Sequence, residues 1–311
     1  MKVCYFIQTH KNPQQIYRLV QTLKNSSLNA QILVGHDFTS CSLDFTPLHH
    51  LPDVHLLRIN RPGIRGNFSL LQPYLQAINW LFTNNSDFDW LFYLSGQDYP
   101  TQPLSKVENF LIATDYDGFI DYINLHTPES ESPWEKKEVI KRYFYQYYRL
   151  PRYVPKYVQK ILAKALKFKR FARFASIPFD ELIIGMPANK TPFNDNFLCY
   201  GGSQWHTLSR KCVEYVKYFI DNNNSFVKYY KKTLVPDESF IQTILINNRN
   251  LKLCNGNKRC IEFIGANADR PRLITNQDYE TLINGSFHFA RKFEQDTKIL
   301  DMLDSYMFTN C

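Results

Sequence analysis

The run Val235-Pro236-Asp237-Glu238-Ser239-Phe240 places two neighbouring carboxylates directly after a proline. Proline is favoured at the first position of a helix, so we predict a helix that begins at Pro236-Asp237 and continues to about Asn247. Glu238 then lies in the first turn, where the helix dipole favours the ionised carboxylate that a general base needs. Asp237 is better suited to cap the helix. By position alone, both acids are better explained as surface residues at a helix start, where the dipole favours them.

Basic side chains near the C-terminus could hold an anionic leaving group. The run Phe289-Ala290-Arg291-Lys292-Phe293 contains two adjacent cations, and Arg270 and Arg272 flank a proline upstream of it. Paired cations can stabilise the charge that develops on a departing diphosphate. Because a surface lysine or arginine is normally solvated, the spacing alone is weak evidence for such a site.

The elements that must position these residues alternate between strand and helix in the first half of the chain. Hydrophobic periodicity predicts strands over residues 3–7, 31–34, 54–59, 90–94 and 118–123. It predicts one helix capped by Asn12, a second over 69–82, and a third opened by a capping box of Ser105 with Glu108. This order indicates an α/β domain with a mostly parallel central sheet flanked by helices.

Polar side chains follow three of these strands, at the edge where such sheets bind ligands. His10 follows the first strand, Asp37 the second and the turn Ser95-Gly96-Gln97-Asp98 the fourth. Sites in parallel sheets lie beyond the carboxyl ends of the strands. Asp87-Phe88-Asp89 has the spacing of a metal-binding DxD motif, but it precedes the strand over 90–94 and therefore lies at the wrong edge. We interpret it as a turn.

Length and composition indicate one globular unit. The 311 residues are 44% hydrophobic and 15% aromatic, which suffices for a single large core. No window approaches the roughly 18–20 apolar residues of a membrane span, and the N-terminal apolar run is too short for a signal peptide. We therefore expect a cytoplasmic protein with a single domain over 1–311. The seven cysteines include no CxxC pair, so we expect free thiols.

The last third of the chain returns to helices with clear boundaries. We predict that Ser209 caps a helix that continues to about Ile220. Thr275 with Asp278 predicts a capping box for another helix, which ends at Asn284-Gly285.

The formal charge of +8 is concentrated in the middle of the chain. Eleven cations and no acid lie between Lys141 and Arg173, and the strand–helix alternation stops over 125–185. We predict a basic, tyrosine-rich helical insertion there, with a helix over 156–174. Its interleaved aromatic and aliphatic residues favour contact with an anionic membrane or a lipid-linked acceptor. An acidic glycan is the next alternative, nucleic acid the least favoured, and a solvated helix remains open.

Several motifs occur in a particular order along the chain. They are His10-Lys11-Asn12-Pro13, Leu94-Ser95-Gly96-Gln97-Asp98-Tyr99-Pro100, Gly201-Gly202-Ser203-Gln204-Trp205, Val213-Glu214-Tyr215, Pro236-Asp237-Glu238 and the run 289–293. Together they resemble the core-2/I-branching β-1,6-N-acetylglucosaminyltransferase and peptide O-xylosyltransferase family, glycosyltransferase family 14. The similarity covers about 1–122 and 198–294. It is poor over 125–195, where members of the family differ in acceptor.

The resemblance implies a fold of the GT-A type and an inverting transferase that uses a nucleotide-diphospho-sugar. It implies that Glu238 is the general base and that Lys292 binds the diphosphate. Arg270 is our choice for the second cation, with Arg272 in reserve. The family uses basic side chains in place of a DxD-bound cation, so we expect no metal and no cofactor.

The resemblance also suggests contacts to the two substrates. The candidates for the nucleotide and donor sugar are His10, Asp37, Arg65, Gly202 and Ser203, and those for the acceptor are Asp98 and Trp205. Glycine would let the backbone approach the sugar closely. A capping or core role is the alternative for His10 and Asp37, and a core aromatic is the alternative for Trp205.

We therefore expect transfer of N-acetylglucosamine or xylose from a UDP-sugar to a hydroxyl of a glycan or lipid-linked acceptor. The UDP-sugar is a substrate, and the segment 141–173 would hold the enzyme at the inner membrane face without binding nucleic acid. The alternative is a non-catalytic protein of the same fold that binds a glycan or nucleotide sugar. Glu238 and Lys292 favour the enzyme, since a binding protein needs neither.

Overall fold

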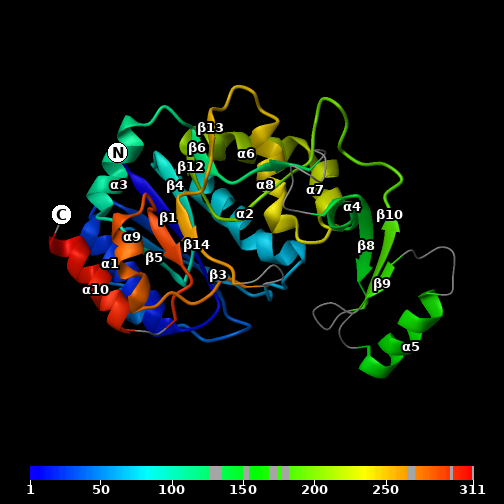
Figure 1. Ribbon diagram of the computed structural model, residues 1–311, viewed down its shortest axis with the longest axis horizontal. Helices are drawn as coiled ribbons and strands as arrows, with labels where there is room; N and C mark the ends of the chain where they lie inside the picture. Colours follow the sequence, from blue (N-terminus) through cyan, green and yellow to red (C-terminus); the bar gives the residue numbers. More distant parts are fainter. Residues whose placement is uncertain are drawn as a thin grey trace.

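A seven-stranded sheet forms the centre of the protein (Figure 1). The computed structural model describes residues 1–125, 135–149, 154–167, 174–176, 182–264, 270–294 and 297–309. The strands of the central sheet, in spatial order, are β13 (Leu253–Asn255), β6 (Gly118–Ile120), β12 (His206–Ser209), β4 (Trp90–Ser95), β1 (Val3–Thr9), β2 (Gln31–Asp37) and β3 (Val54–Ile59). Only β12 runs antiparallel to its neighbours in this sheet, so the predicted mostly parallel α/β architecture is confirmed.

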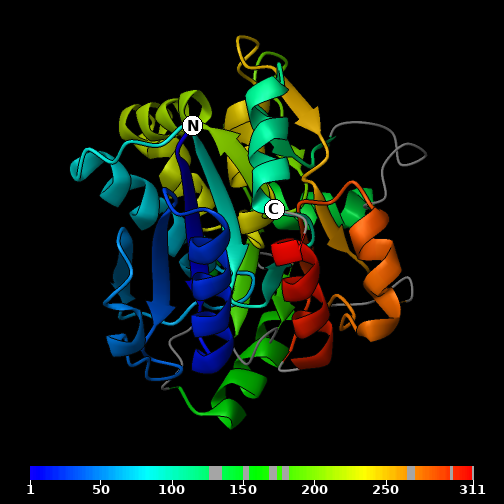
Figure 2. The same ribbon diagram turned by 90° about the vertical axis from the view of Figure 1, so that its left-hand side faces the viewer.

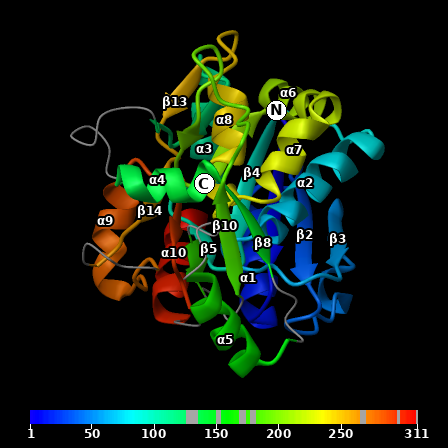
Figure 3. The same ribbon diagram turned by 90° about the vertical axis from the view of Figure 1, so that its right-hand side faces the viewer.

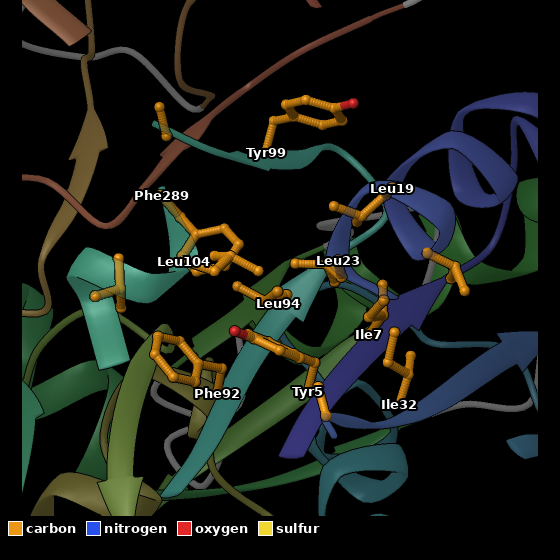
Figure 4. Close-up of a cluster of buried hydrophobic side chains, with 14 of the residues drawn as sticks. Tyr5, Ile7, Leu19, Leu23, Ile32, Phe92, Leu94, Tyr99, Leu104 and Phe289 are labelled. Atoms are coloured by element: carbon orange, nitrogen blue, oxygen red, sulfur yellow. The ribbon is translucent and has the colours of Figure 1, made fainter. Parts of the chain in front are cut away.

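Helices cover both faces of the sheet because side chains alternate between faces along each strand. Tyr5 and Ile7 of β1 belong to one buried cluster, and Phe6 belongs to the other. The helices on the first face are α1 (Pro13–Ser26), α3 (Leu104–Ala113), α9 (Tyr279–Asn284) and α10 (Thr297–Thr309). Those on the second are α2 (Phe68–Thr83), α6 (Arg210–Asn222), α7 (Asn224–Tyr230) and α8 (Phe240–Ile246). Figure 2 shows α1 and α10 in front of the sheet, and Figure 4 shows the first cluster around β1 and β4.

The helix starts test the predicted caps. Pro13 begins α1 as expected, but Asn12 adopts a left-handed backbone (φ 55°) and makes no side-chain capping bond, so that prediction was wrong. The Ser105 capping box was also wrong, because α3 begins at Leu104, after Pro103, so that Ser105 lies inside the helix. Glu108 instead accepts a hydrogen bond from Ser27 Oγ at 2.5 Å.

Two caps in the last third agree with the sequence. Ser209 Oγ accepts from the backbone N–H of Cys212 at the start of α6. Thr275 and Asp278 form the predicted capping box at the 3₁₀ turn η5 (Asn276–Asp278), which leads into α9. The helix predicted over 236–247 is divided instead. A 3₁₀ turn η4 (Pro236–Glu238) is followed by α8, with Ser239 between them.

A second, smaller sheet joins the C-terminal segment to the end of β4. Its strands are β14 (Arg259–Ile261), β15 (Phe289–Arg291) and β5 (Asp98–Pro100), and β15 lies in the middle. The antiparallel register of β5 and β15 sets Asp98 opposite Arg291. The predicted strand over 118–123 is likewise divided, into β6 and β7 (Ile123–Asn124), and β7 pairs with β11 (Tyr200–Gly201).

The basic insertion is a mixture of helices and strands, so the prediction of a purely helical segment was wrong. It contains α4 (Lys136–Tyr143), β8 (Tyr145–Arg149), α5 (Lys156–Lys167), β9 (Phe174–Ser176) and β10 (Ile183–Pro187). The three strands form an antiparallel sheet in the order β8-β10-β9. Phe174 therefore lies in a strand, and residues 168–173 lie outside the described ranges. Figure 3 shows α5 at one end of the molecule, beyond this small sheet.

The remaining elements do not change this arrangement. The loop between β2 and β3 contains a 3₁₀ turn η1 (Thr46–Leu48). The six cysteines in the described ranges are free thiols, as expected. In the same ranges, no helix combines the length and the apolar character needed to cross a membrane.

Candidate active site

The carboxyl ends of β1, β2 and β4 meet at one edge of the sheet, as predicted. Their registers pair Thr9 with His36 and Gln8 with Ser95. His10 is exposed at this edge, whereas Asp37 is buried. The structure therefore brings the predicted strand-end residues together, although not all of them face outward.

The Asp37 carboxylate is hydrogen-bonded to the loops that follow β2 and β3. The carboxylate accepts hydrogen bonds from the hydroxyl (2.5 Å) and backbone N–H (2.9 Å) of Thr39, from the Gly63 N–H (3.2 Å) and from the Ser40 hydroxyl. Burial acts to raise the pKa of Asp37, but these hydrogen bonds outweigh it and the pKa lies below its ordinary value. Asp37 thus holds the loop after β3 against the end of β2. The pKa of nearby His10 lies below its ordinary value, because partial burial of the ring and the charge of Lys11 outweigh the opposing effect of Asp37.

A group of cations gathers around Lys292 at the end of β15. Burial lowers the pKa of Lys292, and Lys11, Arg291 and Arg270 lower it further. Such mutual repulsion is relieved when an anion binds, so the group is suited to a phosphate or diphosphate. Lys292 and Arg270 lie within electrostatic reach of each other, which a joint role at a diphosphate requires. Lys11, which the sequence did not single out, also acts on Lys292, and its ammonium lies 3.8 Å from the Glu294 carboxylate.

Arg272 does not belong to this cation group. Its guanidinium forms ion pairs with Glu262 and Asp278, both at 2.6 Å. Asp278 is the residue that completes the capping box of η5. Arg272 therefore braces the start of α9, and its reserve role in binding the leaving group is corrected.

Asp98 and Trp205 form part of the floor beneath the cation group. Asp98 is fully buried (0% exposed), accepts from the backbone and hydroxyl of Ser95 (2.9 and 2.7 Å), and lies 3.2 Å from Arg291 Nε. The Arg291 guanidinium lies 3.9 Å from the centre of the Trp205 ring, which is 8% exposed. Their prediction as acceptor contacts is corrected, because both side chains are covered by Arg291.

This floor also orients Lys292. Arg291 turns inward to Asp98, and the backbone N–H of Phe293 donates to Gln97 O at 2.9 Å. The residues on both sides of Lys292 are therefore fixed to the turn after β4. Lys292 itself remains half-buried beside the other cations.

Glu238 lies in a tight turn that precedes α8. Val235 has a left-handed backbone (φ 49°), and the Gly202 N–H donates to the Glu238 carbonyl at 2.8 Å. The Glu238 side chain is 37% exposed, so a substrate can reach it. Burial raises the pKa of its carboxyl, and Arg142 and then Arg65 oppose that rise. A cation therefore favours the ionised form, in place of the helix dipole that we predicted.

Asp237 is buried and does not cap a helix, which corrects that prediction. Neither η4 nor α8 has a side-chain capping bond at its start, and Asp237 Oδ1 has no hydrogen-bond partner among the described residues. Burial, followed by the charge of Glu238, raises the pKa of Asp237 to about 7. The two acids differ because Glu238 is ion-paired and more exposed, so Glu238 is the better proton acceptor.

Arg142, from α4 of the insertion, is a residue of the candidate site that the sequence did not single out. Its Nη1 donates to Glu238 Oε2 at 2.8 Å, and its other nitrogen pairs with Glu138. The Arg142 carbonyl accepts from the Leu234 N–H at 3.0 Å, and the Tyr143 hydroxyl donates to the Val235 carbonyl at 3.2 Å. Within a run of eleven cations, no local signal distinguished Arg142 from the others.

Buried Tyr93 of β4 is coupled electrostatically to Asp237 and to Arg291. Burial raises the pKa of its hydroxyl, Asp237 raises it further, and Arg291 lowers it. Its ring lies 5.1 Å from that of Trp205, measured between centroids. The Val235 N–H donates to the Gly66 carbonyl at 3.2 Å, so the turn of Glu238 lies against the loop after β3, at the same carboxyl edge where Lys292 follows β15.

The backbone of Gly202 lies against the backbone of Asp121. The carbonyl of the next residue, Ser203, accepts a hydrogen bond from Gln242 Nε2 at 2.7 Å. A Cβ atom on Gly202 would lie 1.9 Å from the Asp121 carbonyl oxygen. This approach explains the glycine by backbone packing, and Gly202 also holds the turn of Glu238 through its N–H.

Gly202→Ala is expected to lower the free energy of unfolding by about 3 kcal/mol, at the upper end of the usual cost of overpacking. Gly63→Ala is the matched control, because the nearest atom to its added Cβ, Leu70 Cδ1, lies at an ordinary 3.4 Å. Denaturant melts of both variants measure the difference. Equal melts would contradict the close approach at Gly202.

The DxD sequence at 87–89 lies at the opposite, amino edge of β4. Asp87 forms an ion pair with Lys2 Nζ (2.8 Å), and Asp89 Oδ2 accepts from the Lys2 backbone N–H (2.6 Å). Across the ranges that the structure describes, no three His, Cys, Asp or Glu side chains are grouped so that they could hold a metal ion. Two surface hollows, of about 430 and 540 Å³, are lined by residues of α9 and α10 and by residues of η1 and β3.

Comparison with known proteins agrees with the motifs. A family model described as "Branch: Core-2/I-Branching enzyme" matches residues 3–282. Xylosyltransferase 2 of Rattus norvegicus is 26% identical over 282 residues, which cover 83% of this chain and 28% of that protein. Beta-glucuronosyltransferase GlcAT14B of Arabidopsis thaliana is 30% identical over 112 residues, 35% of this chain and 26% of that protein. The chain thus spans less than a third of either relative.

Among solved structures, TarS of S. aureus (residues 1–349, in complex with UDP-GlcNAc) is similar with a TM-score of 0.30 and 13% identity. That similarity covers 51% of this chain and 43% of TarS, and a score this low does not establish a common fold. The family model, in contrast, covers most of the chain. This protein therefore belongs to the core-2/I-branching enzyme family.

Proposed function

We propose that this protein is an inverting glycosyltransferase that moves a sugar from a UDP-sugar to a hydroxyl group of a glycan or lipid-linked acceptor. The observation that carries the proposal is the reachable, arginine-paired carboxylate of Glu238 at the same sheet edge as the cation group of Lys292. A base and an anion site on one edge are what an inverting displacement of a diphosphate requires.

In the proposed reaction, Glu238 accepts the proton of the acceptor hydroxyl as that oxygen attacks the anomeric carbon. The bond between this carbon and the diphosphate oxygen breaks on the opposite face, so the configuration inverts. Lys292 and Arg270, assisted by Lys11, stabilise the negative charge on the departing UDP. Their charges replace the divalent cation that many transferases of the GT-A type use, so the reaction is proposed to need no metal.

The donor is proposed to be UDP-N-acetylglucosamine or UDP-xylose. Exposed His10, Arg65 beside Glu238, and the backbone of Gly202 and Ser203 are the candidates for its contacts. Asp37 contributes indirectly, by ordering the loop around Gly63. The relatives are named as a xylosyltransferase and a beta-glucuronosyltransferase, which supports sugar transfer as a class and does not choose the donor.

The test is to incubate the purified protein with a panel of UDP-sugars and to measure UDP release, with and without EDTA. Turnover of one donor that persists in EDTA is the expected result, and the anomeric configuration of the product, read by NMR, should be inverted. Binding of a UDP-sugar without turnover, in the presence of a range of acceptor glycans, would favour the alternative of a non-catalytic binding protein.

The pH dependence tests the role of Arg142. Arg142→Met is expected to move the acidic limb of the profile of kcat/KM to higher pH. Arg142 lowers the pKa of Glu238, so its loss lets burial raise that pKa further, and a base must be ionised to accept a proton. Arg142→Lys keeps the charge and should recover part of the shift. A uniform loss of activity with an unmoved limb would show that Arg142 is only structural.

A further inference from the structure

We propose that α5 is an interfacial helix that docks the protein on an anionic lipid surface. The proposal goes beyond the transferase chemistry, and binding to lipid can be measured without any activity. It rests on the two faces of α5, on the charge of the insertion and on the side of the molecule from which the helix projects.

One side of α5 is attached to the protein body. Gln159 is buried, donates from Nε2 to the Val154 carbonyl (2.8 Å) and accepts at Oε1 from the Leu182 N–H (3.0 Å). At about 100° per residue, positions 157 and 161 fall on the side of the helix opposite Gln159. There Tyr157 is 68% exposed and Ile161 is 62% exposed.

Lysine positions adjoin this strip on the helical wheel. The positions 156, 160, 164 and 167 fall within about 80° of one another around the helix and carry its four lysines. Lys160 is exposed, next to Tyr157 and Ile161 on the helix surface. A lysine face adjoining exposed aromatic and aliphatic side chains is the arrangement of helices that lie in the interface of a bilayer.

The charge of the insertion selects an anionic partner. From residue 139 to residue 179 the sequence contains eleven lysines and arginines and no aspartate or glutamate. A helix on an ordinary solvated surface mixes charges of both signs, which limits the repulsion between them. Anionic headgroups attract such a basic segment, and the apolar side chains then enter the interface. Nucleic acid would use the lysines, but it would leave Ile161 and Leu162 without a partner.

The position of α5 brings the proposed site to the lipid. The N-terminus, where β1 begins, lies near the top in Figures 1 to 3, and β1 runs downward from it. α5 lies at the lower end in all three views, the end toward which β1, β2 and β4 run. A membrane against α5 would therefore face the edge that holds Glu238, as a lipid-linked acceptor requires. The orientation of the site toward a lipid-linked acceptor rests on the proposed function, whereas the proposed binding of α5 to lipid does not.

Sedimentation with vesicles of phosphatidylcholine, with and without phosphatidylglycerol, tests the proposal on the full chain. We expect binding only with phosphatidylglycerol, and weakening as salt rises. The double variant Lys160→Glu/Lys164→Glu should bind at least tenfold more weakly. Tyr157→Ser/Ile161→Ser should reduce the binding that persists at high salt. The matched control is Tyr218→Ser/Lys228→Glu, which changes one exposed aromatic and one exposed lysine on α6 and α7.

None of these residues belongs to the proposed catalytic site, so UDP release with a soluble acceptor should be unchanged in every variant. Unchanged release also shows that each variant is folded. Failure of wild type to bind anionic vesicles, or equal loss in the control, would overturn the proposal. The surface would be assigned to nucleic acid if the protein bound single-stranded or duplex DNA more tightly than vesicles and if Tyr157→Ser/Ile161→Ser left that binding unchanged. If the wild-type protein released no UDP, that result would count against the proposed function and would not affect the conclusion on lipid binding.

Discussion

Glu238→Gln is expected to lower kcat for sugar transfer by about 10²- to 10⁴-fold, the usual contribution of a general base. Glutamine keeps the shape of the side chain and an oxygen that can still accept from Arg142 Nη1, now 2.8 Å from the carboxylate. It cannot take the proton of the acceptor hydroxyl. Kd for the donor, measured by calorimetry, should change little because Glu238 lies on the acceptor side of the proposed reaction.

The control for this substitution is Glu214→Gln on α6, whose carboxylate pairs with Arg210 on the surface. It should leave kcat unchanged. Asp237→Asn separates the two neighbouring acids. If Asp237→Asn abolished transfer while Glu238→Gln retained it, the base would be Asp237, whose pKa of about 7 also allows proton exchange near neutral pH. Full activity in both variants would remove this turn from the mechanism.

Lys292→Ala is expected to lower kcat/KM by about 10²- to 10³-fold, as for other groups that stabilise charge in a transition state. Lys292 is the centre of the cation group, since Lys11, Arg291 and Arg270 all act on its pKa. Burial and these neighbours lower that pKa below its ordinary value, so Lys292 should lose its proton, and activity should fall, at a lower pH than for a solvated lysine. Initial rates of UDP release, measured over a range of donor concentrations, give the effect.

Lys252→Ala is the matched control, because Lys252 precedes β13 and its exposed ammonium pairs only loosely, at 3.6 Å, with the exposed Asp115. Lys292→Arg should retain more activity than Lys292→Ala, since it keeps the positive charge. An unchanged kcat/KM for Lys292→Ala would contradict the assigned role. Abolition of wild-type turnover by EDTA would contradict the metal-free reaction, whatever the effect of the lysine.

Much of the fold was predictable because its signals are local. β3 has the predicted bounds, and β1, β2 and β4 extend the predicted strands by one to three residues. Short buried apolar runs bounded by turn residues are typical of strands, and their alternation with helices indicates a mostly parallel sheet. The two caps at Ser209 and Thr275 were also predictable, because a side chain and a backbone N–H two or three residues apart suffice to form them.

The insertion was predicted less well because its local pattern is ambiguous. Tyr145–Arg149 contains mostly tyrosine and polar residues, without the apolar run of a central strand. It becomes β8 through pairing with β10, which lies more than thirty residues later in the chain. A short edge strand of this kind is stabilised by its partner, and neither β8 nor β10 can be recognised as a strand from its own sequence.

The sequence by itself determined which residue types reach the carboxyl edge of the sheet, because strand ends follow from local hydrophobic runs. Only the tertiary structure decided which of them face outward. Asp98 reached the expected edge but is buried, because the pairing of β5 with β15 sets Arg291 opposite it. Glu238 was identified from its motif, whereas its partner Arg142 lies 96 residues earlier, on a helix of the insertion. Contacts over such distances come from packing between elements, and no spacing along the chain encodes them.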